Sequence, residues 1–114
     1  MSSLVISGGW SRPYARLGRL SKEAFGWPFG LLELSDEALI FRARWVGGSH
    51  SIVISIADLE RVDERRRWML AHRLLEFRTS DPQTDRMRFT SWPKALRALT
   101  SELASRGVPV VDVG

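Results

Sequence analysis

The chain has 114 residues, a formal net charge of +4 and 44% hydrophobic residues, which fits one domain with a substantial core and excludes wholesale disorder. It contains no cysteine, so disulfides, thiolate metal sites and thiol nucleophiles are excluded. No apolar run approaches the about 20 residues that span a bilayer, and the N-terminus lacks the basic flank of a signal peptide. We therefore expect a cytoplasmic protein.

Residues 1–26 are expected to form an irregular N-terminal arm, because glycine and proline interrupt any regular element there. Part of this arm could instead form a short helix, capped by Ser21, whose apolar face consists of Leu17, Leu20, Ala24 and Phe25. Basic residues at helical spacings would then gather on its other side, at Arg12, Arg16, Arg19 and Lys22. Such an arm either packs on the domain or becomes ordered only when a partner binds.

A period-two alternation of apolar residues then predicts strands at 31–34, 39–45 and 52–56. The first two are separated by a polar turn at 35–37. The second has an apolar face and a partly charged face that carries Arg42 and Arg44. The last two are separated by a glycine-rich segment that is expected to form a hairpin turn and to hold His50.

The segment that follows is more charged. Leu59 and Val62 are three residues apart, which indicates a turn or bulge at the start of a strand that continues into the charged run 63–67. Residues 68–71 fit either a short strand or a turn. Two further strands, joined by a polar hairpin loop, are expected around Phe77 and Phe89.

The clearest signal in the sequence is a helix at about residues 93–106. Pro93 suits the first helical position, with Ser91 or Trp92 as the cap. An apolar stripe follows at helical spacing, formed by Leu96, Leu99 and Leu103. Gly107 suits the left-handed residue that ends a helix. The apolar tail 108–113 either adds an edge strand or lies on the surface.

These elements predict an α+β domain that is mainly β, with six or seven short antiparallel strands and one C-terminal helix over residues 27–114. So few strands cannot close an eight-stranded barrel. We therefore expect a partly open barrel whose end is capped by the helix, which protects the strand edges best.

Three segments carry a resemblance to a known family. Residues 27–39 (WPFGLLELSDEAL) resemble the opening hairpin of bacterial pleckstrin-homology-like and GRAM-like domains, and residues 54–62 (ISIADLERV) resemble a later strand of these domains. The helix that begins at Ser91-Trp92-Pro93 resembles their closing segment. The resemblance implies a non-catalytic scaffold that binds lipids, peptides or proteins, or that self-associates. Phosphoinositide-binding members carry basic residues at the first hairpin loop, where this chain has Ser35-Asp36-Glu37.

Motifs for catalysis or cofactor binding are not found in the sequence. His50 and His72 are the only histidines, and they do not have a metal-binding spacing. The sequence contains no nucleophile elbow, phosphate-binding loop or dinucleotide fingerprint. Carboxylates at 58–64 alternate with arginines, as expected for a solvated strand edge with cross-strand ion pairs. We expect no enzyme activity, cofactor or metal.

Arginine and tryptophan are the residue types that suggest a binding surface. Trp10 and Trp68 are expected at the surface, whereas Trp45 and Trp92 fit the core or the barrel rim. The best candidate for contact with an anion or partner is the run Arg65, Arg66, Arg67 and Trp68, together with the basic residues of the arm. A general preference of the genome for arginine codons would explain the same composition without a site.

The sequence leaves two functions open. The first is a non-catalytic interaction module that binds an unknown protein or peptide, or forms a homo-oligomer, through a strand edge or the groove beside the helix. The alternative is a peripheral binder of anionic lipid, or less readily of nucleic acid, through the arginine clusters.

Overall fold

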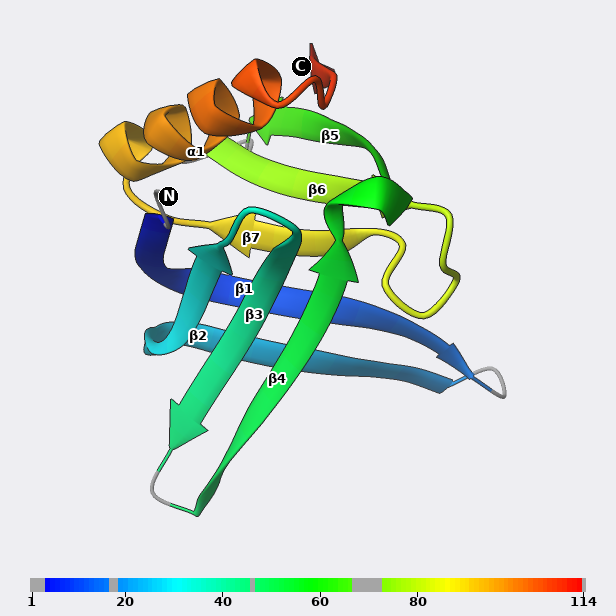
Figure 1. The fold of residues 1–114 in the computed structure, drawn as a ribbon. Coiled ribbons are helices and arrows are strands. Elements are labelled where there is room, and N and C mark those ends of the chain that lie inside the picture. The colour runs from blue at the N-terminus through cyan, green and yellow to red at the C-terminus, as the bar shows by residue number, and fades with distance from the viewer. Residues whose placement is uncertain (1–3, 17–18, 46, 67–72, 114) are drawn as a thin grey trace.

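The computed structural model describes residues 4–16, 19–45, 47–66 and 73–113, with side chains for all of these except 13–29, 45 and 66. Eight strands, one short 3-10 helix and one α-helix make up this part of the chain (Figure 1). In chain order they are β1 (Leu4–Arg16), β2 (Arg19–Leu34), β3 (Ala38–Trp45), β4 (Gly48–Ser55), η1 (Ile56–Asp58), β5 (Leu59–Arg66), β6 (Arg73–Thr79), β7 (Met87–Thr90), α1 (Pro93–Ser105) and β8 (Val110–Asp112).

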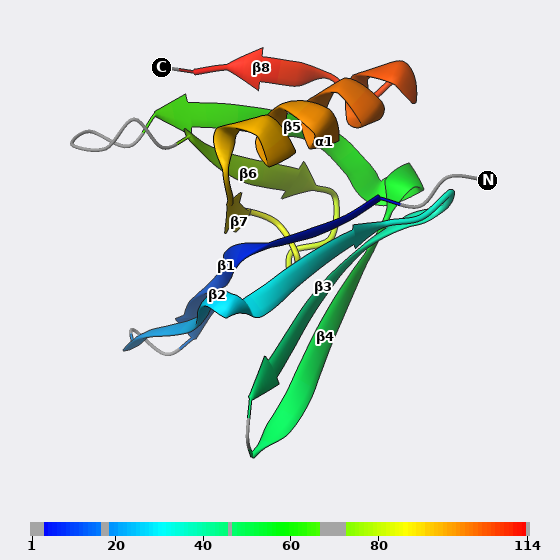
Figure 2. The same cartoon turned by 90° about the vertical axis from the view of Figure 1, so that its left-hand side faces the viewer.

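The strands form one open sheet in the order β4-β3-β2-β1-β7-β6-β5-β8. The pairs are antiparallel except β5 and β8, which run parallel. Figure 2 shows β3 and β4 running at a steep angle to β5 and β6, with α1 over the latter. The mainly β architecture with one C-terminal helix is as predicted, but the described residues hold eight strands rather than six or seven.

The expectation of an irregular N-terminal arm is wrong. Residues 4–16 form β1, which lies at the centre of the sheet and pairs with β2 on one side and β7 on the other. The residues proposed for a short helix belong to β2, apart from Leu17, which lies outside the described residues.

The glycines and prolines that suggested irregular structure lie within strands, where they allow a close approach between strands and a bulge. Gly8 allows β1 to approach β7, since a Cβ atom there would lie 2.3 Å from the carbonyl oxygen of Thr90. Gly8 pairs with Gly30 and Trp10 with Phe25, so residues 26–29 of β2 bulge opposite the single residue Gly9. Glycine and proline are common at such bulges because the strand ladder is interrupted there.

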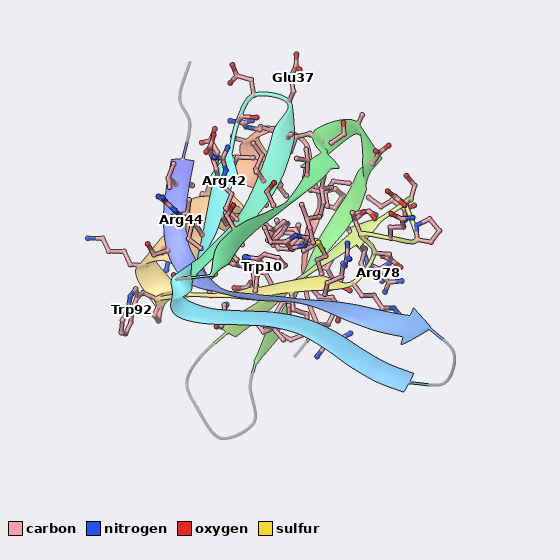
Figure 3. All side chains as sticks on the ribbon, turned by 90° about the horizontal axis from the view of Figure 1, so that it is seen from below. Trp10, Glu37, Arg42, Arg44, Arg78 and Trp92 are labelled. Atoms are coloured by element: carbon pink, nitrogen blue, oxygen red, sulfur yellow. The ribbon has the colours of Figure 1, made fainter. Side chains whose placement is uncertain are left out.

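The core fills the space between the two halves of the sheet. Phe41 from β3 packs edge-on against Phe77 and Phe89 of the other half, at ring-centroid distances of 5.3 and 6.4 Å. Trp10 is only 2% exposed, and its indole N–H donates to the carbonyl oxygen of Arg42 at 2.8 Å. The prediction that Trp10 lies at the surface is therefore wrong, because its position on β1 points it into the core (Figure 3).

Helix α1 confirms the clearest prediction. Trp92 is the cap residue, Pro93 begins the helix, and the leucine stripe of Leu96, Leu99 and Leu103 is buried. Gly107 has the expected positive φ of 86°. Trp92 itself is 63% exposed, which corrects its assignment to the core or rim. Among the described residues, no helix has the length and apolar character needed to cross a bilayer.

The connections between elements agree with the sequence in most places. The polar turn after β2 is closed by a hydrogen bond from the amide of Ser35 to the carbonyl of Ala38. The turn and bulge predicted before β5 are found as η1 and a register shift between Leu59 and Arg61. The tail takes the first of its two expected forms, because β8 adds an edge strand beside β5. The question of a strand or turn at 68–71 lies outside the described residues.

Candidate functional site

The described residues among those predicted to contact an anion or partner lie on two different strand pairs, β1 with β2 and β5 with β6. The arm residues lie on the β1–β2 hairpin, where Arg16 pairs with Arg19 and Pro13 with Lys22. They follow a strand and not the expected helix. Arg12 is half-buried, whereas the side chains of Arg16, Arg19, Lys22 and Arg66 are not among those described. Arg67 and Trp68 lie outside the described residues, so Arg65 is the one member of that run whose contacts are known.

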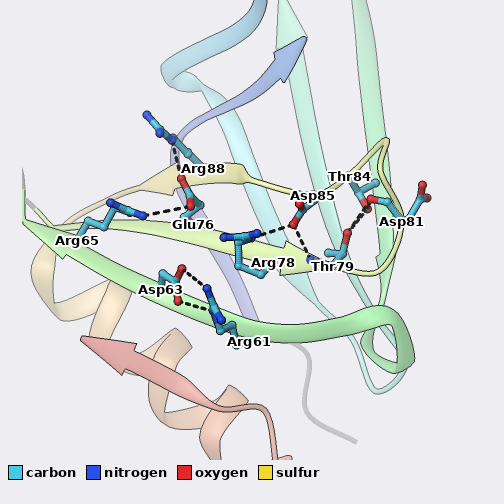
Figure 4. A network of polar contacts seen from close by, with 10 residues as sticks. All are labelled: Arg61, Asp63, Arg65, Glu76, Arg78, Thr79, Asp81, Thr84, Asp85 and Arg88. Carbon is cyan, nitrogen blue, oxygen red and sulfur yellow. Dashed lines mark hydrogen bonds and ion pairs between the residues drawn. The ribbon is translucent and has the colours of Figure 1, made fainter. Parts of the chain in front are cut away.

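Arg65 belongs to an outward face of β5, β6 and β7 that we call the arginine face, formed by Arg61, Arg65, Arg78 and Arg88 (Figure 4). Glu76 receives a hydrogen bond from Arg88 at 3.1 Å and an ion pair from Arg65 at 3.6 Å. Asp63 accepts a hydrogen bond from Arg61 at 2.9 Å. The arginines are therefore bound to carboxylates on the same surface.

The two carboxylates of this face are buried although they point outward. Asp63 and Glu76, which pair directly across β5 and β6, are only 1% and 2% exposed because the arginine side chains cover them. A buried carboxylate needs a charged partner, and removing that partner is costly. The expected cross-strand ion pairs are found, for example between Arg65 and Glu76, but the expectation of a solvated strand edge is wrong, since β5 has β8 on its other side. The arginines of the arginine face are therefore paired mainly with carboxylates of the same face.

The loop between β6 and β7 is held by a similar local network (Figure 4). Asp85 accepts hydrogen bonds from the amide of Thr79 at 3.0 Å and from Arg78 at 3.1 Å. Partial burial alone would raise the pKa of Asp85, but these bonds lower it below its ordinary value. The hydroxyls of Thr79 and Thr84 lie 2.8 Å apart inside the loop. These contacts fix the conformation of the loop.

A more open site lies on the other half of the sheet, over β2, β3 and β4. It is a depression of about 730 Å³ lined by Gly30, Leu31, Arg42, Ala43, Arg44, Ser49, His50 and Ser51. His50 stacks on Trp10 beneath it, with ring centroids 6.1 Å apart. The prediction that His50 lies in a hairpin turn is wrong, because β4 already begins at Gly48.

The arginines of this depression have few partners. Arg42 forms an ion pair with Glu33 at 3.5 Å, and half of its side chain is exposed. Arg44 lies on the same side of β3 (Figure 3) and makes no hydrogen bond or ion pair with the residues that the structure describes. Unlike the arginine face, this surface thus presents positive charge that its own acids do not fully match.

The depression borders the unpaired edge of the sheet. In the described part of the chain, β4 has β3 as its single strand partner. Its eight residues, Gly48–Ser55, contain no lysine, arginine, acidic residue or proline, and Val53 is 58% exposed. Natural proteins usually protect an edge strand with charges, proline or a covering element. The opposite edge strand, β8, is only three residues long, and a very short edge strand offers little for a partner to pair with.

No protein-family model matches the chain, and no curated protein matches it in sequence. Among the described residues, no group of three or more histidines and acidic residues is placed to hold a metal ion. The sequence did contain a signal for the β4 edge, namely an uncharged alternating run of eight residues. Its importance could not be recognised before the strand order placed β4 at the end of the sheet.

Proposed function

We propose that the chain is a non-catalytic, pleckstrin-homology-like interaction module that binds an extended protein segment by strand addition to β4. The observation that carries this proposal is the uncharged β4 edge, which has β3 as its single strand partner among the described residues, whereas the other edge strand, β8, is only three residues long. In strand addition, the backbone N–H and C=O groups of an exposed edge pair with the partner's backbone, and side chains along the edge give selectivity.

The architecture supports the pleckstrin-homology-like part of the proposal. Strands β1–β4 and β5–β7 are two antiparallel meanders joined by the pairing of β1 with β7, and the two open ends of the sheet are β4 and β8. The helix follows directly after the second meander. This arrangement supports the partly open barrel with a closing helix that the resemblance implies, and the resembling residues 27–39 lie in the hairpin of β2 and β3.

Binding of an anionic membrane or a nucleic acid is the second candidate. It is supported by the half-exposed guanidinium groups of Arg61, Arg65 and Arg88 on one face. It is weakened by the carboxylates of Asp63 and Glu76 beneath them, which cancel much of the attraction for an external anion. Co-sedimentation with anionic vesicles over a salt series tests it. Binding that fades as salt rises would favour this candidate over strand addition.

Amide hydrogen exchange with a peptide panel tests strand addition. The probes are peptides of about ten residues, the upper length of common strands, built on a β-forming valine and threonine host. At saturation, at least one peptide should slow exchange at residues 48–55 while β8 is unaffected. The matched control is the same peptide with N-methylated amides at alternate positions, which keeps every side chain but removes the donors that face β4. Strand addition would be contradicted if no peptide slowed amide exchange at residues 48–55. It would also be contradicted if the N-methylated peptide slowed exchange as much as its unmethylated counterpart.

A further inference from the structure

The outward side chains of β3 and β4 form three rows that lead to the free edge. The pairing places Arg44 opposite Ser49, Arg42 opposite Ser51, and Ile40 opposite Val53. Their neighbours on the inward side are buried core residues, namely Phe41, Ala43, Ile52 and Ile54. Because side chains alternate along a strand, the three rows share the outward face. Each row would continue onto the outward side chain of an added strand.

The size of the β4 side chains decides what such a strand could touch. An added strand would lie about 4.8 Å from β4 and about twice that distance from β3. Ser49 and Ser51 are short, and the depression of about 730 Å³ lies over them. A long side chain on β3 can therefore extend over a serine toward the added strand. Arg42 and Arg44 are the long side chains in those two rows.

The charge of the same rows favours one kind of partner. Arg44 has no hydrogen bond or ion pair with the described residues, and Arg42 shares a single carboxylate, that of Glu33, at 3.5 Å. No residue of β4 carries an acidic group. Planar guanidinium groups bind carboxylates well and with defined geometry. The third row ends at the exposed Val53, which suits an apolar neighbour instead.

We propose that β4 binds an extended acidic segment whose outward residues are, in N-to-C order, an apolar residue beside Val53, a carboxylate beside Ser51 and a carboxylate beside Ser49. This inference rests on the proposed strand addition. The order follows from an antiparallel arrangement, which is the more stable pairing and the one used by the other strands of this meander. In this arrangement the side chains of Arg42 and Arg44 extend over the two serines, and their guanidinium groups bind the two carboxylates.

Three peptides built on the same valine and threonine host test this inference. They differ only at the two alternate positions expected beside Ser51 and Ser49, which hold glutamate, glutamine or lysine. Exposed ion pairs of this kind are modest, so we expect the glutamate peptide to bind about fivefold to tenfold more tightly than the glutamine peptide at low salt. The lysine peptide should bind most weakly. The preference should decrease as salt is raised.

Arg44→Gln should remove most of the preference for glutamate while the glutamine peptide binds unchanged. Arg97→Gln is the matched control, because it makes the same charge change at an exposed position on α1, away from β4. Both variants should keep the thermal midpoint of the wild type. An unchanged glutamate preference in Arg44→Gln would overturn the role of this arginine.

Hydrogen exchange separates failure of this inference from failure of the proposed function. If the glutamine peptide protects β4 as tightly as the glutamate peptide, strand addition stands and the acidic preference is wrong. If no peptide slows exchange in β4, both are wrong. If the chain alone dimerises and its β4 amides are protected, the occupant of the edge is a second copy and the acidic partner is wrong.

Discussion

Substitution of Gly8 by alanine should destabilise the fold strongly, because β1 and β7 meet there without room for a side chain. The added Cβ would lie 2.3 Å from the carbonyl oxygen of Thr90 and 2.8 Å from the ring of Phe89. Ordinary contact begins near 3.4 Å, so the backbones must separate by about 1 Å. Phe89 is fully buried, and β1 is joined to β7 by three residue pairs alone.

We expect a loss of about 3 kcal/mol in the free energy of unfolding, at the upper end of the usual cost of overpacking. For a domain of this size, this corresponds to a fall of about 10 °C or more in the thermal midpoint. Thermal and urea denaturation, followed by circular dichroism and tryptophan fluorescence, measure the two quantities. Both probes should report one transition, because Trp10 lies beside the altered contact.

Gly107→Ala is the matched control for this experiment. Gly107 has a φ of 86° and open space around the position of a Cβ atom, so its substitution costs only the left-handed strain of about 1 kcal/mol. If Gly8→Ala were no more destabilising than Gly107→Ala, the close approach of β1 and β7 would not be a determinant of stability, and our reasoning would be refuted.

Three other perturbations test the packing and the ion pairs. Leu99→Ala should cost about 2–5 kcal/mol because this residue on the buried face of α1 is fully buried; an unchanged melting midpoint would exclude the packing of the helix on the sheet. Deletion of residues 1–16 should abolish cooperative unfolding, because it removes the central strand β1; a folded remainder would restore the idea of a separable arm. The pKa of Asp85 is lower in the folded state, so its contribution to stability is complete above its unfolded value and is lost as pH falls below about 4. Asp85→Asn should flatten that acid limb of the stability curve measured by urea denaturation, and an identical acid limb in wild type and variant would exclude this linkage.

The helix and the alternating strands could be predicted because each is specified locally. The leucine stripe of α1 and its ends at Pro93 and Gly107 need no distant partner to be recognised. The same is true of the apolar alternation in β3. These features were enough to predict the fold class and the general position of the core.

The first strand could not be predicted in this way, because its pattern depends on a distant strand. Gly8 appears as a helix or strand breaker in the sequence, yet it is required by the side chain of Phe89 and the backbone of Thr90. The burial of Glu76 also depends on Arg65 and Arg88, which come from the two neighbouring strands. Local patterns assign such carboxylates to solvent, since a single strand gives no information on what lies across it.

The candidate site was only partly visible in the sequence for a related reason. Arg42 and Arg44 were recognised as a charged face of a strand, but their importance comes from the two serines on β4 opposite them. The sequence does not say which strand lies at the edge. That information comes from the strand order, in which β1 and β7 meet at the centre.

The pairing of β1 with the distant strand β7 at the centre of the sheet has a consequence for synthesis on the ribosome. The hydroxyl of Ser91 donates to the carbonyl oxygen of Ser7 across 84 residues of sequence, and β1 pairs with β7 just beside this bond. A nascent chain can therefore complete its first meander early, but it cannot close the junction until residues 87–91 have left the exit tunnel. During this interval β1 remains an edge strand, and contacts of such high sequence separation form slowly.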